Sequence, residues 1–230
     1  MNLLAFDTST DTLCIAVQRA DALWQHRGPG GAQTSAHLLP SIQRLMGEAQ
    51  LDFKALDAIV FGRGPGSFTG LRTACSIAQG LAFGAGVPVL PVDTLLAVAE
   101  EARTVHGCTQ VVAVLDARMN EVYHAPYRWQ DGAWLAEGEL GLCAPEALPV
   151  PAGWTVAGNA QAAYGERLAP QALHVAALPT AAALLRLAPG LLATQGSLPA
   201  GAALPLYIRD KVAQTTAERA AARLAANPAP

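Results

Sequence analysis

The sequence has little charge and no excess of basic residues. Only 14% of its 230 residues are charged, and the formal net charge is −3 at pH 7. Proteins that coat nucleic acid carry a strongly basic surface, so the overall balance argues against that class and leaves room only for a local basic patch. The 52% of hydrophobic residues is instead typical of a compact protein with a substantial core.

Paired cysteines, a secretory leader and a membrane span are also missing. The four cysteines (Cys14, Cys75, Cys108 and Cys143) are widely scattered, without the two-residue spacing of a zinc or redox motif. We therefore expect free thiols in a reducing compartment. The N-terminal segment MNLLAFDTST lacks a basic region and reaches an acid at Asp7, and no apolar run approaches about 20 residues. We expect a cytoplasmic protein without membrane contact.

Metal-binding and catalytic constellations are not evident in the histidine pattern. No histidine lies three or four residues from another, so the helical pair of a zinc enzyme is absent. Spacing alone assembles no Ser/His/Asp set. The sequence thus predicts no catalytic residue and no metal ligand in this chain. The histidines are His26, His37, His106, His124 and His174.

Apolar periodicity predicts an α/β order in the first hundred residues. Three strands are followed by a helix, a strand, a helix, a strand and a helix. The expected strands are 3–6, 13–18, 23–26, 56–61 and 87–92, and the expected helices are 35–50, 67–84 and 94–103.

The second half of the chain repeats the start of the first. LLAFDTSTDTLCIAV and VAVLDARMNEVYHAPY each read as an apolar strand ending in Asp, a polar turn and a β-rich run, which makes Asp7 and Asp116 equivalent. Duplication of this size predicts two α/β subdomains, 1–105 and 106–210, before a tail, 211–230, that is helical or frayed. Further strands are expected at 134–140, 155–157 and near His174, and helices at 161–168 and 180–192.

The stretch GRGPGSFTGLR, from Gly62 to Arg72, places a glycine-rich turn between a strand and a helix. A P-loop needs Lys directly after its last glycine, whereas Gly70 is followed by Leu71. A dinucleotide fingerprint needs Gly or Ala where Ser67 stands, so neither motif is present. Ser67 is a good N-cap, and the helix start could attract an anion, but a turn that only needs permissive backbone angles fits equally well.

The helix that follows carries small residues every fourth position, from Gly66 to Ala82. This stripe allows close approach either of the protein's own sheet or of a helix in another chain. The second interpretation predicts a partner surface on this helix and the preceding one. Its residues are Leu38, Leu39, Ile42, Leu45, Gly66, Ser67, Phe68, Gly70, Leu71, Arg72, Ala74, Cys75 and Ala78.

The turn after the first strand has the composition of a phosphate and metal site. Hydroxyls of Thr8, Ser9 and Thr10 can bind phosphate while Asp7 holds a metal ion, although such residues also make ordinary turns. Pairing with Asp116 favours two sides of one cleft. We interpret Asp7, Thr8, Ser9, Thr10 and Asp116 as a degenerate phosphate turn.

These features together resemble the bacterial TsaB family, also called YeaZ. The resemblance extends to about Arg209, and the glycine stretch is its most specific part. It rests on LAFDTST, SAHLLPSIQRL, LDAIVFGRGPGSFTGLRTACSIAQGLAFGAGVPVLPVDTL, VLDARMNEVYHAPY and PLYIRD.

The resemblance implies an actin/Hsp70/sugar-kinase fold made of two duplicated ribonuclease-H-like subdomains. It also implies a non-catalytic subunit that dimerises with its catalytic paralogue TsaD. With the ATPase TsaE, the two install threonylcarbamoyl on the adenosine next to the tRNA anticodon. We expect no cofactor on this chain alone, ATP and metal on the partners, indirect contact with tRNA, and a possible homodimer.

Two other functions stay open at the level of sequence. One is a self-sufficient kinase or ATPase of the same fold, in which Asp7 and Asp116 would hold magnesium. The other is a metalloprotease, as the glycoprotease label of the wider family suggests. His37 stands alone where TsaD-like enzymes have a metal pair, which argues against catalysis by this chain.

Overall fold

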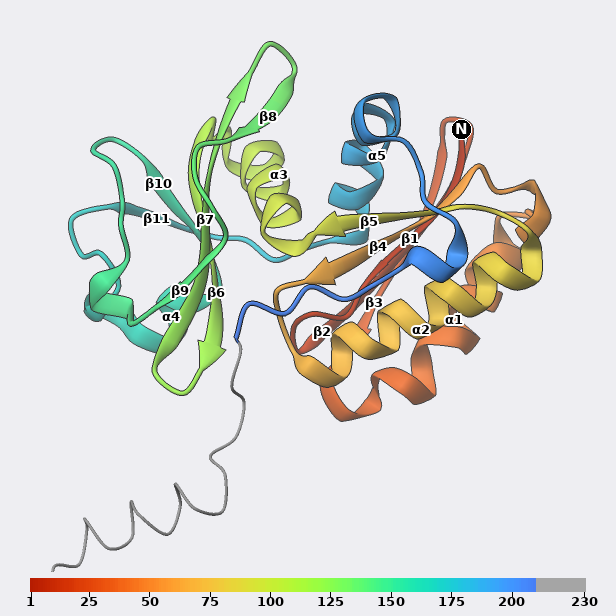
Figure 1. The fold of residues 1–230 in the computed structure, drawn as a ribbon, viewed down its shortest axis with the longest axis horizontal. Coiled ribbons are helices and arrows are strands. Elements are labelled where there is room, and N and C mark those ends of the chain that lie inside the picture. The colour runs from red at the N-terminus through yellow and green to blue at the C-terminus, as the bar shows by residue number, and fades with distance from the viewer. Residues whose placement is uncertain (210–230) are drawn as a thin grey trace, which may run out of the picture.

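The computed structural model describes residues 1–209, which form two β-sheets side by side (Figure 1). The first sheet has the order β3-β2-β1-β4-β5, and the second β11-β10-β6-β7-β8, with β9 paired to β7. The strands are β1 (Asn2–Asp7), β2 (Thr12–Arg19), β3 (Ala22–Pro29), β4 (Ala58–Gly64), β5 (Val89–Asp93), β6 (Gln110–Arg118), β7 (Glu121–Gln130), β8 (Ala133–Ala136), β9 (Gly141–Cys143), β10 (Thr155–Gly158) and β11 (Leu173–Ala176).

The two sheets repeat one topology. Strand β1 pairs antiparallel with β2 and parallel with β4, and β6 likewise pairs antiparallel with β7 and parallel with β10. Each half is therefore an antiparallel meander extended by two parallel strands. This arrangement confirms the predicted fold class, two duplicated ribonuclease-H-like subdomains of the actin/Hsp70/sugar-kinase type.

Helices cover both faces of the first sheet. Helices α1 (Thr34–Glu48) and α2 (Phe68–Ala85) pack on the face that carries Leu4 and Phe6. Helix α5 (Ala181–Gln195) packs on the opposite face, which carries Leu3 and Ala5. Because side chains alternate along a strand, the continuous apolar run of β1 fills both layers of core.

The two halves exchange their last helices. Helix α3 (Thr94–His106) follows the first sheet, yet its apolar side chains pack against β6 and β7 of the second. Helix α5 follows the second sheet and packs on the first. The short helix α4 (Ala160–Tyr164) helps cover the remaining face of the second sheet. The predicted boundary at residue 105 falls at the end of α3.

Three elements of the second half differ from the prediction. The expected strand 134–140 is only β8, Ala133–Ala136, because the chain turns outward at exposed residues 137–139. The expected helix 161–168 is α4 followed by a 3-10 turn, Gly165–Arg167, since Gly165 adopts a positive φ that ends the helix. Strand β9 was not predicted. The tail 211–230 lies outside the described residues.

The cysteines form no disulfide, and the helices of residues 1–209 are not of the kind that spans a membrane. All four cysteines are free, as predicted; Cys14 and Cys75 are buried, and Cys108 and Cys143 are partly so. Within residues 1–209, none of the helices combines the length and apolar character that crossing a bilayer requires.

Candidate functional site

A cavity of about 370 Å³ lies between the two halves, where strands β1 and β6 end. Ligands of open α/β sheets usually bind at such carboxyl ends. The turn after β1 and the start of α2 line one wall, the end of β6 and its turn line a second, and residues 206–209 line a third. The principal polar residues of the lining are Ser9, Thr10, Asp11, Ser67, Asp116, Arg118, Asn159 and Arg209.

Asp7 lies behind this cavity and is fully buried. The backbone N–H and the hydroxyl of Ser9 donate to its Oδ1 at 2.9 and 2.6 Å, and the hydroxyl of Thr94 donates to Oδ2 at 3.4 Å. Burial raises the pKa of Asp7 to about 6, because the loss of hydration outweighs these hydrogen bonds. Of the predicted phosphate turn, Ser9 and Thr10 line the cavity, whereas Asp7 and Thr8 do not.

Asp116 does line the cavity, and its carboxylate is also occupied. The hydroxyl of Tyr164 and the backbone N–H of Arg118 donate to Oδ1, each at 2.8 Å. The Arg118 guanidinium lies 3.2 Å from Oδ2 of Asp116 and reaches Asp11 of the first half at 2.8 Å. The Asp116 backbone N–H donates to Oδ1 of Asn159. The two halves are thus joined across the cavity mouth by an ion pair.

The glycines of the GRGPGSFTGLR stretch pack against the turn that follows β1. A Cβ at Gly62 would lie far closer than 3.0 Å to Oδ2 of Asp7, and one at Gly66 would lie 2.5 Å from the carbonyl oxygen of Ser9. Gly70 faces the carbonyl of Thr8 with equally little space. Glycine is therefore required here because a side chain at these positions would overlap the Asp7 carboxylate or the backbone of Thr8 and Ser9.

Hydrogen bonds fix the same contact. The backbone N–H of Ser67 donates to the Ser9 carbonyl at 2.7 Å, and the hydroxyl of Thr8 donates to the Gly70 carbonyl at 2.7 Å. The Ser67 hydroxyl accepts from the Gly70 N–H at 3.4 Å, which is the N-cap that the sequence predicts. The glycine turn thus docks on the chain's own Thr8–Ser9 turn.

The small-residue stripe of α2 faces the protein's own sheet, which corrects the predicted partner surface. Most of the predicted interface residues are buried within the single chain and belong to the core or its margin, so no partner can touch them. These buried residues are Leu38, Ile42, Leu45, Gly70, Leu71, Ala74, Cys75 and Ala78.

The remaining predicted interface residues stay accessible. Phe68 and Arg72 are exposed, and Leu39, Gly66 and Ser67 are partly exposed. The outer face of α2 also carries Phe83, which is absent from the predicted interface. Its side chain is 85% exposed, the highest value among the large apolar residues of 1–209. The sequence signal that could have identified Phe83 is its position outside the small-residue stripe, which indicates a side chain on another face of the helix.

Residues 204–209, here called the strap, cross from the first half to the second (Figure 1). The Leu206 N–H donates to the Arg63 carbonyl at 2.7 Å, and the ring of Tyr207 lies 5.4 Å from that of Phe68. Arg209 then pairs with Glu121 of the second half at 2.5 Å. Sequence reasoning found PLYIRD only as part of a family resemblance and assigned it no place.

Several known proteins are similar to this chain over most of its length or over half of it. The protein from Escherichia coli (strain K12) described as "tRNA threonylcarbamoyladenosine biosynthesis protein TsaB" is 32% identical over 223 residues, which cover 93% of this chain and 96% of that protein. The chain belongs to the TsaB family. A TsaB from Haemophilus influenzae is 43% identical over 123 residues, covering 54% of this chain and 52% of its own length.

Solved structures place the fold in the TsaB family as well. The structure described as "YeaZ from Pseudomonas aeruginosa" has a TM-score of 0.84 and 38% identity, over 90% of this chain and 99% of that one. Another, at 39% identity, is described as an uncharacterized protein "with similarity to peptidase YEAZ". The family model "TsaD: tRNA N6-adenosine threonylcarbamoyltransferase" matches residues 30–139. As a TsaB protein, the chain functions in the biosynthesis of threonylcarbamoyladenosine in tRNA.

Proposed function

We propose that this chain is a non-catalytic subunit for tRNA threonylcarbamoyladenosine formation, acting with a TsaD-like catalytic paralogue and a TsaE-like ATPase in the cytoplasm. ATP and metal bind to those partners, and tRNA is contacted through the complex. One observation carries the proposal. The space between the Asp7 turn and the glycine turn is filled by the backbone contact between Gly66 or Gly70 and Thr8–Ser9.

Phosphate cradles offer unpaired backbone N–H groups and room for the oxygens. Here the Ser67 N–H is bonded to Ser9, and the Gly70 N–H to the Ser67 hydroxyl. The carboxylates of Asp7 and Asp116 accept hydrogen bonds from the chain itself. Pairing of these groups within the chain itself favours a protein that supports catalysis elsewhere.

Pairing of the basic side chains supports indirect contact with tRNA. Affinity for nucleic acid depends on Lys and Arg that are free to neutralise phosphates. Most of the described arginines instead lie in ion pairs with carboxylates. They are Arg44, Arg63, Arg103, Arg118, Arg128, Arg167, Arg186 and Arg209.

The partner surface on α1 and α2 is then their outer face. Phe68 and Arg72 project from α2 with the Arg72 guanidinium 3.8 Å from the Phe68 ring centre, and Phe83 lies farther along the helix. Aromatic and arginine side chains dominate binding energy at protein interfaces. We propose this face for the TsaD-like partner, and for a homodimer where one forms.

Reconstitution tests the proposal. With tRNA, ATP and an activated donor of the threonylcarbamoyl group supplied, modified tRNA is expected only when this chain, the TsaD-like protein and the TsaE-like protein are all present. Asp116→Asn should leave the turnover of the assembled complex within about threefold, because loss of a true catalytic group costs 10²-fold or more. A larger loss with intact assembly would identify this chain as catalytic.

The two rival functions have their own readouts. Calorimetry of the isolated chain with magnesium and ATP should show no micromolar binding, and such binding would favour the kinase or ATPase. Peptide-bond cleavage that a chelator abolishes would favour the metalloprotease. The approximately 370 Å³ cavity is the feature on which either rival would depend.

A further inference from the structure

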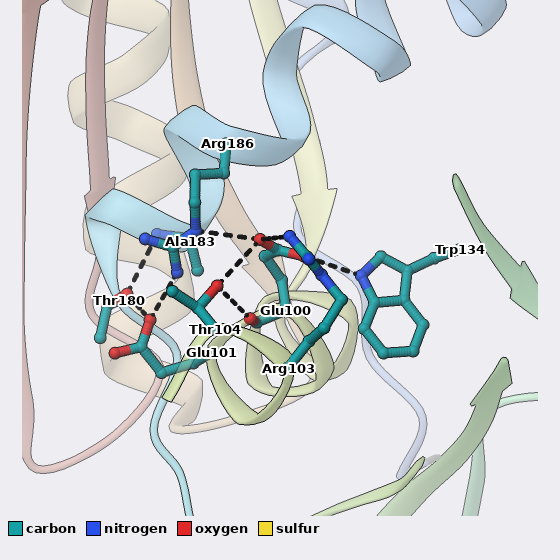
Figure 2. Close-up of polar contacts among 8 residues, drawn as sticks. All are labelled: Glu100, Glu101, Arg103, Thr104, Trp134, Thr180, Ala183 and Arg186. Carbon is teal, nitrogen blue, oxygen red and sulfur yellow. Dashed lines mark hydrogen bonds and ion pairs between the residues drawn. The ribbon is translucent and has the colours of Figure 1, made fainter. Parts of the chain in front are cut away.

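A carboxylate outside the candidate site is buried among positive charges between the halves. Glu100 of α3 is 1% exposed, and Figure 2 shows side chains from three elements converging on it. Arg103 donates to both carboxylate oxygens, at 2.9 and 3.0 Å, while Arg186 of α5 donates at 2.9 Å. The indole N–H of Trp134, on β8, donates at 2.9 Å. The four residues are here called the Glu100 cluster.

A second set of contacts extends the cluster along α5. Glu101 accepts from the other end of the Arg186 guanidinium at 2.7 Å and from the hydroxyl of Thr180 at 2.8 Å. Thr180 is also the N-cap of α5, because its hydroxyl accepts from the Ala183 N–H (Figure 2). The start of α5 is thereby bonded directly to α3.

The cluster joins the helices that the two halves exchange. Helix α3 is packed on the second sheet, α5 on the first, and β8 is the edge strand of the second. Any rotation of one half against the other must slide α3 along α5. Such a movement would pull Arg186 away from the buried Glu100 carboxylate, and a buried charge that loses a partner is strongly unfavourable.

The strap closes the junction elsewhere. In Figure 1 α3 and α5 lie side by side above the junction of the sheets, and the strap passes below them. Its bonds run from Leu206 to Arg63 of the first half and from Arg209 to Glu121 of the second. The Arg118–Asp11 pair spans the cavity mouth. The halves are thus tied at both ends of their interface.

We propose that the Glu100 cluster, together with the strap, locks the two halves in one relative orientation. Closure about a hinge is the common motion of two-lobed proteins around a ligand. This chain instead keeps its cavity and the outer face of α2 in a fixed geometry. The inference rests on contacts within the chain and holds whether or not the proposed partners are correct.

Distances between spin labels test the lock. Labels at the exposed positions Gln43 of α1 and Gln161 of α4 report on the two halves, with Cys108 and Cys143 replaced by serine. The labelled chain is diluted into an excess of unlabelled chain, so that only distances within one chain are measured. We expect one narrow distance distribution that is unchanged by magnesium and ATP. Two distances, or a shift on adding the nucleotide, would overturn the proposal.

Substitutions in the Glu100 cluster test whether it is what holds the two halves in one orientation. Glu100→Gln should at least double the width of the distribution, because a neutral amide leaves Arg103 without its carboxylate and Arg186 paired only with Glu101. Trp134→Phe keeps an aromatic ring and removes one hydrogen-bond donor to Glu100, so it should widen the distance distribution less. If Glu100→Gln does not fold, the width measured for Trp134→Phe tests the role of the cluster. Glu137→Gln is the control, since Glu137 pairs with Arg128 at a more exposed site on the same hairpin. Parental widths in folded Glu100→Gln and Trp134→Phe would refute the assignment.

Discussion

Gly62 lies so close to Asp7 that a Cβ at position 62 would overlap the Asp7 carboxylate. The second half repeats the relationship, because a Cβ at Gly158 would overlap the carbonyl oxygen of Val114, two residues before Asp116. In each half, the strand that pairs in parallel with the first strand of its sheet, β4 or β10, therefore carries a glycine that lets the neighbouring strand fit beside it. The glycine at position 62 is therefore needed for close packing of neighbouring strands, as is Gly158 in the second half.

Gly62→Ala should destabilise the protein by about 3 kcal/mol, because the added methyl must displace a fully buried carboxylate. Gly80→Ala is the matched control, since nothing lies within 4 Å of its Cβ position in α2. That change should stabilise the helix by up to about 1 kcal/mol. Urea unfolding measures both effects, and equal midpoints for the two variants would contradict the packing argument.

Ala78→Trp should unfold the protein or cost about 3 kcal/mol or more, because Ala78 is fully buried against the sheet. Phe83→Ala, on the outer face of the same helix, should change stability by no more than about 0.5 kcal/mol. Thermal melts compare the variants, and sedimentation with the TsaD-like partner follows assembly. An Ala78→Trp protein that melts like the parent would show that the stripe is accessible after all.

The fold could be predicted from the sequence because its signals are local and repeated. The apolar run Leu3–Phe6 ends in Asp7, the run Val112–Leu115 ends in Asp116, and each is followed by polar turn residues and a β-rich segment. Recognition of this duplication sets the topology. The weaker second half was predicted less well, since β8 and α4 are short and end at exposed or glycine positions.

The sequence could not show which surface the small-residue stripe of α2 packs against, and the reason is physical. Small residues such as Gly70, Ala74 and Ala78 permit close approach of any flat surface, and the sequence does not say whether that surface is a sheet or a partner. The cavity walls depend on long-range pairs, such as Tyr164 with Asp116 and Arg209 with Glu121. No periodicity or spacing rule connects these residues.

The isolated chain should bind tRNA no more tightly than about 10⁻⁴ to 10⁻⁶ M at physiological salt, the range of non-specific contacts. The reason is that most described arginines are held by carboxylates, for example Arg118 by Asp11 and Arg167 by Glu146. Filter binding at several salt concentrations gives both the affinity and the number of phosphates neutralised. Nanomolar binding with a steep salt slope would refute indirect contact.

Asp7→Asn should raise stability at neutral pH. The pKa of Asp7 is 3.8 as its reference value and about 6 in the folded protein, so the folded state holds this proton more tightly. The carboxyl group therefore favours folding most below pH 3.8. That contribution is lost as the pH rises through about 6, where ionisation of the buried group reaches its full cost of about 3 kcal/mol at most.

Asparagine keeps an oxygen for the Ser9 hydrogen bonds and cannot ionise, so the variant lacks this loss. The stability difference between Asp7→Asn and the parent should be small near pH 4, grow between pH 4 and 6, and stay level above that range. Urea unfolding at each pH measures this difference in stability. Glu100 has the opposite effect on the pH dependence, because its hydrogen bonds to Arg103, Trp134 and Arg186 outweigh burial and lower its pKa. That effect is the same in the variant and the parent, so it cancels in the difference. Asp57→Asn, which alters an exposed carboxylate, serves as control. A pH-independent difference for Asp7→Asn would mean that Asp7 titrates normally and that its contact with Gly62 leaves room for water.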